Sequence, residues 1–115
     1  MGKTVAIDCS LPDFVAVVGG ESYHLRYDFG AFRAYEKATG VNPLTPEFEI
    51  NATNLDRFLW AGFQRQHPQL TVEQIQEWLI PSNMRGFLNL AADAYYACIP
   101  RPEEQKEASM DPQSA

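Results

Sequence analysis

The sequence predicts a small α+β fold, with an N-terminal antiparallel β-hairpin followed by about four α-helices. Three observations indicate this class. Apolar residues alternate on both sides of Gly19-Gly20, apolar positions recur at helical spacing in later segments, and glycine or proline closes each of those segments. We expect one domain over residues 1–99 and a disordered acidic tail over residues 100–115, where almost nothing can be buried.

Gly19-Gly20 predicts a tight two-residue turn, because both turn positions take a positive φ that glycine tolerates. The turn sets the cross-strand pairs Val18 with Glu21, Ala16 with Tyr23, and Phe14 with Leu25. The second and third of these pairs share one face, which we expect to be the core side. Residues 4–10 alternate in the same way, which allows a third strand ahead of the hairpin.

The first helix is predicted over residues 29–39, between Asp28 as the N-cap and Gly40 as the stop signal. Its apolar residues recur at helical spacing and are Phe29, Phe32, Tyr35 and Ala38. Residues 41–53 are rich in Pro, Thr and Asn, and are predicted to form a loop.

The second helix is predicted to begin near Asn54 and to end around residues 66–68. Thr53 and Asp56 resemble a capping box, with a shorter acid than usual. The apolar stripe of this helix consists of Leu55, Phe58, Leu59, Gly62 and Phe63. We expect that stripe to face the core.

The third helix is predicted from the capping box of residues 71–74 and ends before Pro81. Its apolar face consists of Val72, Ile75 and Leu79. Ser82 is predicted to cap the fourth helix, which stops before Pro100. The apolar stripe of the fourth helix consists of Met84, Phe87, Leu88, Ala91, Tyr95 and Cys98.

The charge of the chain argues against nucleic acid as a partner. Nine Lys and Arg are scattered among fifteen Asp and Glu, for a net charge of −6, whereas phosphate-backbone binding requires clustered cations. No apolar run approaches a membrane span, and the N-terminus lacks an apolar signal region. Cys9 and Cys98 are not a close-spaced pair of the metal or redox type. We expect a cytoplasmic protein with free thiols and no membrane contact.

The sequence contains no recognisable catalytic set. His24 lies on the polar side of a predicted strand, and His67 stands beside Pro68 at a helix end. Neither histidine has a Ser, Cys or carboxylate at a motif spacing. Zinc-protease, nucleophile-elbow and phosphate-loop motifs do not occur. We therefore expect a non-enzymatic protein that uses no metal or cofactor.

Four large side chains lie beside the predicted apolar stripes rather than on them: Trp60, Trp78, Leu90 and Tyr96. One interpretation is that their helices are buried on more than one side of a small core, because large aromatic residues usually find interior packing. The other is that they form an exposed apolar patch, which binds another protein or a second copy of this chain. On the second interpretation these four are the candidate partner-binding residues.

Four segments follow one another in the chain: residues 23–31 (YHLRYDFGA), 36–44 (EKATGVNPL), 59–63 (LWAGF) and 67–73 (HPQLTVE). Together they resemble the tail assembly chaperones of long-tailed phages and of related gene transfer agents. In that family a hairpin strand with Tyr-x-Leu-Arg precedes a helix ending at Thr-Gly, a Leu-Trp-Ala-Gly helix and a His-Pro-x-Leu-Thr-x-Glu segment. The likeness covers roughly residues 15–98, and residues 1–12 have no counterpart in the family's core pattern.

The resemblance implies a non-enzymatic role in the cytoplasm of a host bacterium. Members of the family bind the long, apolar, helical tape measure protein during tail assembly and keep it soluble. Many are also made in a longer, frameshifted form that recruits the tail tube protein. A different interpretation stays open, in which the chain is a small self-associating or adaptor domain of a prophage or host locus and forms a homo-oligomer.

Overall fold

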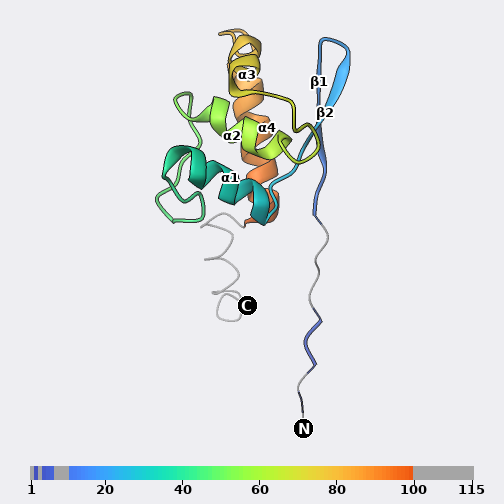
Figure 1. The fold of residues 1–115 in the computed structure, drawn as a ribbon, viewed down its shortest axis with the longest axis vertical. Coiled ribbons are helices and arrows are strands. Elements are labelled where there is room, and N and C mark those ends of the chain that lie inside the picture. The colour runs from blue at the N-terminus through green and yellow to red at the C-terminus, as the bar shows by residue number, and fades with distance from the viewer. Residues whose placement is uncertain (1, 3, 7–10, 100–115) are drawn as a thin grey trace, which may run out of the picture.

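The structure, a computed structural model, describes residues 2, 4–6 and 11–99. The elements in chain order are β1 (Phe14–Val18), β2 (Glu21–Leu25), α1 (Phe29–Thr39), α2 (Leu55–Phe63), α3 (Val72–Trp78) and α4 (Met84–Cys98) (Figure 1). The predicted α+β class is confirmed. Of the allowed third strand, residues 4–6 are not in a strand and residues 7–10 lie outside the described part, as does the predicted tail of residues 100–115.

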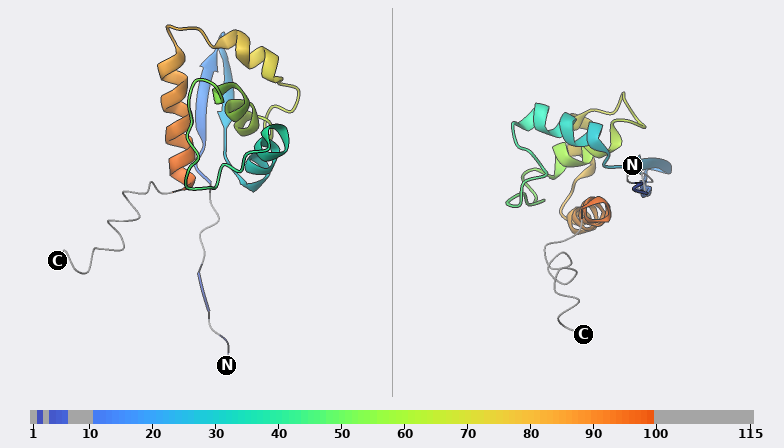
Figure 2. Two further views of the ribbon diagram at one scale, coloured as in Figure 1. Left: turned by 90° about the vertical axis from the view of Figure 1, so that its left-hand side faces the viewer. Right: turned by 90° about the horizontal axis from the view of Figure 1, so that it is seen from below.

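The hairpin has the predicted register. The two strands pair antiparallel with Ala16 opposite Tyr23 and Phe14 opposite Leu25. The turn glycines Gly19-Gly20 both have positive φ. Leu25 is fully buried and the other three side chains are partly buried against the core. All four helices lie on one side of the hairpin, so only this face of the sheet is covered (Figures 1 and 2).

The hairpin is joined to α2 by a close backbone contact at Gly62. The Arg26 N–H donates to the Gly62 carbonyl oxygen over 2.9 Å. A Cβ atom at Gly62 would lie 2.5 Å from Leu25 Cδ1 and 2.6 Å from Tyr27 Cζ. The Tyr27 hydroxyl donates to the Phe58 carbonyl oxygen over 2.8 Å. Packing therefore requires glycine at position 62, which the sequence pattern showed only as one member of an apolar stripe.

An aromatic cluster forms the centre of the core. The Phe58 ring of α2 lies 5.5, 5.4 and 5.7 Å from the rings of Tyr35, Phe48 and Tyr95. All four residues are buried. The Tyr95 hydroxyl donates to the Pro43 carbonyl oxygen over 2.5 Å, which ties α4 to the loop after α1. One core thus holds α1, its following loop, α2 and α4 together.

Two of the predicted helix starts are confirmed by side-chain hydrogen bonds. Asp28 Oδ1 accepts the Ala31 N–H over 2.8 Å at the start of α1. Thr71 and Gln74 form the reciprocal capping box of α3. Gly40 ends α1 in the left-handed region, with φ of 78°. Each of these signals acts between residues that are close in the chain, so it forms where the sequence predicts it.

The predicted capping box of α2 is wrong. The helix begins after Asn54 without a side-chain cap. The Thr53 N–H and hydroxyl both donate to Asn51 Oδ1, so the threonine belongs to the preceding turn. Asp56 Oδ1 instead accepts the N–H of Arg57. The helix ends at Phe63, and residues 64–66 form a turn rather than a further helical turn.

The predicted Ser82 cap of α4 is also wrong. The residue before the helix is Asn83, which makes no side-chain cap. Its Oδ1 accepts the Ile80 N–H over 3.0 Å, and its Nδ2 donates to the Trp78 carbonyl oxygen over 2.8 Å. The asparagine thus closes the turn between α3 and α4, because a short amide side chain bonds nearby backbone groups readily.

The predicted apolar stripe of α1 is only partly buried. Phe32 and Tyr35 are buried, whereas Ala38 is exposed and Phe29 is 68% exposed. The Arg33 guanidinium carbon lies 5.8 Å from the centroid of the Phe29 ring. The helix packs mainly against α2, so only the side facing α2 is covered. The stripe of α2, by contrast, is buried at every predicted position.

Candidate interaction surface

The four candidate partner-binding residues are all partly buried. Trp60, Trp78, Leu90 and Tyr96 pack against the core cluster. None of them is among the large apolar side chains that the described residues leave exposed. This environment agrees with helices that are buried on more than one side, and partner binding by these residues stays a prediction.

Trp78 belongs to an aromatic group where α3 meets β2. The Tyr23 ring centroid lies 4.8 Å from Trp78 and 5.0 Å from His67. Trp78 also meets the Phe63 ring edge-on at 6.1 Å. The tryptophan therefore covers the inner face of the hairpin, and its removal would change the packing of β2.

Leu90 lies in a groove between α4 and β1. The groove has a volume of about 210 Å³, and its lining residues are Ala16, Val17, Val18, Asn83, Gly86, Phe87 and Leu90. No charged residue is among them. Of the four candidate residues, Leu90 is the one that this apolar groove contains.

The large apolar side chains that are exposed lie elsewhere than the sequence analysis placed the candidate surface. Val15 and Val17 of β1 are 45% and 68% exposed. Further exposed side chains are Val5 ahead of the hairpin, Phe29 on α1, Val41 and Leu44 in the following loop, and Ile80 between α3 and α4. The two valines had a clear signal, because the predicted register places them on the face opposite the core.

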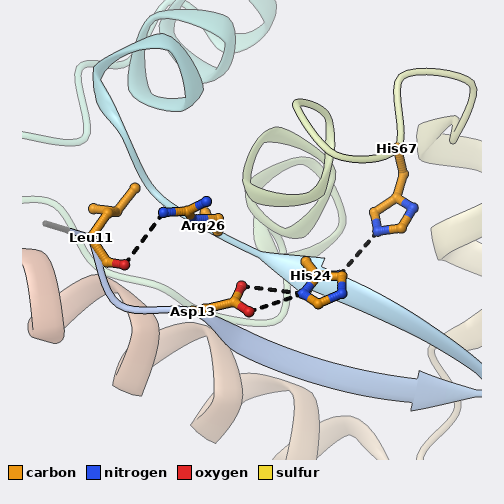
Figure 3. A network of polar contacts seen from close by, with 5 residues as sticks. All are labelled: Leu11, Asp13, His24, Arg26 and His67. Carbon is orange, nitrogen blue, oxygen red and sulfur yellow. Dashed lines mark hydrogen bonds and ion pairs between the residues drawn. The ribbon is translucent and has the colours of Figure 1, made fainter.

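The two histidines, which have no motif in the sequence, meet at the outer edge of β2 (Figure 3). The backbone N–H of His24 donates to His67 Nε2 over 3.0 Å. The two rings are stacked with centroids 6.2 Å apart. His24 Nδ1 lies 3.0 Å from Asp13 Oδ2. The network therefore connects the residue before β1, strand β2 and the loop after α2.

His67 Nε2 is the acceptor of the His24 N–H, a bond that an imidazole nitrogen makes through its lone pair. Arg26 extends the network, because its Nη2 donates to the Leu11 carbonyl oxygen over 3.4 Å (Figure 3). The buried Nε of Arg26 has no partner among the described residues. The contact between the two histidines thus holds the outer edge of β2 to the loop after α2.

The titratable groups of the core favour their neutral forms. Burial raises the pKa of the Cys98 thiol, while a hydrogen bond to the backbone of Tyr27 opposes the rise. Cys98 is a free thiol. Burial also raises the pKa of Tyr27 well above its ordinary value, and raises the pKa of Tyr35 and Tyr95. A thiol held in its neutral form is a poor nucleophile, so the position of Cys98 favours a packing role.

Within residues 2, 4–6 and 11–99, no three His, Cys, Asp or Glu side chains are grouped so as to hold a metal ion. Among the helices of that part, none has the length and apolar character needed to cross a membrane. Comparison with protein-family models, with curated proteins and with solved structures found no match for this chain.

Proposed function

We propose that this chain is a tail assembly chaperone, a non-enzymatic protein that binds the tape measure protein and keeps it soluble during phage tail assembly. The observation that carries the proposal is the ordered set of four segments, residues 23–31, 36–44, 59–63 and 67–73, that resembles this family. The site of action is the cytoplasm of the host bacterium. A frameshifted, longer form would add the tail tube protein as a partner.

The contacts between these segments support the proposal. The first segment meets the third where the Arg26 N–H donates to the Gly62 carbonyl oxygen. It meets the fourth where the His24 N–H donates to His67 Nε2. Short motifs that touch one another in the fold describe one packing arrangement, whereas unrelated short matches would be scattered. In this chain the first, third and fourth segments therefore belong to one connected unit of structure.

The surface of the chain also suits this task. A tape measure helix exposes apolar stripes that would aggregate, and a soluble domain with apolar surface can cover them. The described residues offer the exposed apolar side chains Val41, Leu44 and Ile80. Tube subunits must later displace the chaperone, so several modest contacts suit the role better than one tight site.

The decisive experiment is co-expression with the long, helix-rich protein encoded beside this chain, followed by affinity capture from the soluble fraction. We expect that protein to become soluble and to be retained with the chain. If it stays insoluble while the chain elutes alone, the chaperone proposal is wrong.

Alanine variants test the candidate residues Trp60, Trp78, Leu90 and Tyr96 in the same capture assay. Because these side chains pack against the core, each variant is first checked by urea unfolding. Phe29→Ala is the control, since it removes an aromatic ring that is 68% exposed elsewhere on the molecule. Folded variants that retain the partner as well as Phe29→Ala does would exclude the four residues from the binding surface.

The second candidate function is a self-associating interaction domain. Strand β1 favours it, because it is an edge strand of the two-stranded sheet and an unpaired strand edge can pair with another chain. Co-expression with the tape measure protein separates the two functions, because a self-associating domain would form oligomers but would not retain that protein.

A further inference from the structure

Within the described residues, strand β1 pairs only with β2 and so forms an edge of the two-stranded sheet. In the register, Val15 lies opposite His24 and Val17 opposite Ser22. The His24 N–H points away from β1, since it donates to His67. Residues directly opposite each other orient their backbone groups alike, so the N–H and carbonyl groups of Val15 and Val17 point away from β2. Among the described residues, neither valine has a further hydrogen-bond partner.

The edge lacks the features that normally prevent strand pairing. Strand β1 reads FVAVV and contains no charge, no proline and no glycine. Its pairing with β2 is continuous and includes no bulge. Natural edge strands usually carry a lysine, a proline or a bulge, which discourage pairing with another chain. This strand is therefore a template for an incoming strand.

The groove beside β1 continues the open edge. Figure 2 shows β1 on the side of the sheet nearest α4, and the groove runs between them. Gly86 of α4 lines it, and an added Cβ there would have nothing within 4 Å. Its φ is not positive, so neither packing nor backbone conformation within the chain requires glycine. Glycine destabilises a helix relative to alanine, and a glycine that the monomer does not require can allow the close approach of another backbone.

We propose that two copies of this chain associate through antiparallel pairing of their β1 strands, about a two-fold axis at Ala16. The outward backbone groups lie at Val15 and Val17, which are symmetric about that residue. The axis places Val15 of each copy opposite Val17 of the second copy, and each such pair exchanges two hydrogen bonds. The same operation brings the two α4 grooves together, with the open space at Gly86 between them.

The absence of charge at this face permits a second copy to approach it. The chain has a net charge of −6, so two copies repel one another over much of their surface. The groove lining and β1 contain no charged side chain, so the two copies can meet here without bringing like charges face to face. A five-residue strand is small against the roughly 800 Å² that each partner buries in a stable interface, and the adjoining groove supplies further apolar area.

Sedimentation or light scattering of the full chain, without any partner, tests the proposal. We expect the mass to rise from that of one chain, 13.0 kDa, toward twice that value as the concentration increases from micromolar to millimolar. The Val15 and Val17 amides should become protected from hydrogen exchange over the same range. A mass that stays at one chain throughout overturns the proposal.

The double substitution Val15→Lys with Val17→Lys places like charges directly opposite each other across the axis, which disfavours pairing. We expect it to raise the dimer dissociation constant by up to about thirtyfold, because two like-charge pairs face each other across the axis. The matched control is Val41→Lys with Leu44→Lys, which adds the same charge at side chains that are 45% and 48% exposed in a loop. A dimer that resists the first substitution, or that is weakened equally by the control, lies elsewhere and overturns the proposal.

Gly86→Gln tests the groove without a charge. Glutamine favours the helix and meets no neighbour at Cβ, so the folded monomer should persist. Its side chain should obstruct the approach of the second α4 and weaken the dimer. Asn89→Gln on the same helix, outside the groove, is the control. If the wild type is monomeric and Gly86→Gln only loses a captured partner protein, the edge receives that partner and the second-copy proposal is wrong.

Discussion

Along β2, the outward N–H of His24 donates to His67, and the N–H of Arg26 just beyond the strand donates to Gly62. Along β1, the corresponding backbone groups of Val15 and Val17 have no partner among the described residues. The β2 edge is thus held by the fold at His24 and Arg26, whereas the described residues leave the β1 edge open. We therefore expect substitutions along β2 to change the stability of the fold, and substitutions along β1 to change the association of this chain with another.

The largest expected effect is at the closed edge, from Gly62→Ala. The added methyl would lie 2.5 Å from Leu25 Cδ1 and 2.6 Å from Tyr27 Cζ, in a fully buried seam. Overpacking of this kind costs typically 1–3 kcal/mol and occasionally more, and we expect about 3 kcal/mol here. Urea unfolding measures it. A change below about 0.5 kcal/mol would mean that the seam between β2 and α2 is looser than the structure indicates.

Tyr27→Phe should have the next largest effect. It leaves the buried Phe58 carbonyl without the hydroxyl that lies 2.8 Å away, which we expect to cost about 2 kcal/mol. A loss of stability below about 0.5 kcal/mol, which is typical of an exposed substitution, would show that this hydrogen bond does not stabilise the fold.

The same tyrosine gives the fold a dependence on alkaline pH. The pKa of Tyr27 is raised in the folded state by burial, so the folded chain keeps a proton that the unfolded chain releases above about pH 10. Stability is therefore intact below about pH 10 and falls as the pH rises further. Tyr35 and Tyr95 act in the same direction. In urea titrations from pH 8 to pH 11, Tyr27→Phe should lose stability less steeply than the wild type.

A smaller effect is expected from His67→Leu, which opens the closed edge. It removes the acceptor of the His24 N–H, and a net loss of about 1 kcal/mol follows. At concentrations where the chain is monomeric, the His24 amide should then exchange as fast as the amides of Val15 and Val17. Asp13→Asn is the control, because it alters the other contact of His24 and leaves the His67 bond in place. If the exchange rate of the His24 amide is unchanged in His67→Leu, then His67 is not the acceptor that closes this edge.

The smallest expected effect, and the opposite sign, belongs to Gly86→Ala. The site has open space and an ordinary helical backbone, so alanine should stabilise the monomer by about 0.5–1 kcal/mol. Urea unfolding at low protein concentration measures the gain. Gly62→Ala adds the same methyl group at a closed contact, so the two variants compare a closed site with an open groove. Destabilisation at Gly86 would show that the groove is filled within one chain.

The sequence predicted the elements whose signals are local. The Gly19-Gly20 turn determined the hairpin register, Asp28 determined the start of α1, and residues 71–74 determined the start of α3. The failed caps also involve local bonds, but Thr53 and Asn83 serve neighbouring turns instead of the helices that follow. Short polar side chains can bond several backbone groups, and a motif alone does not select among them.

The candidate surface was less predictable. A helical wheel separates Trp60 and Trp78 from their stripes, yet both pack against the core, because neighbouring elements cover more than one face of each helix. The outward exposure of Val15 and Val17 followed from the alternation, although the candidate surface was sought on the helices. No pattern in the sequence predicts the groove, because its lining residues come from β1 and α4, which only the folded chain places side by side.

By itself, the sequence determined the α+β class, the hairpin register and most helix boundaries, because turns, caps and periodicity act between residues close in the chain. Only the tertiary structure decided the contact of His24 with His67, 43 positions apart, and the need for glycine at position 62. It also decided which edge of the hairpin is closed. Such contacts depend on how the helices pack, and packing brings together residues whose spacing in the chain carries no signal.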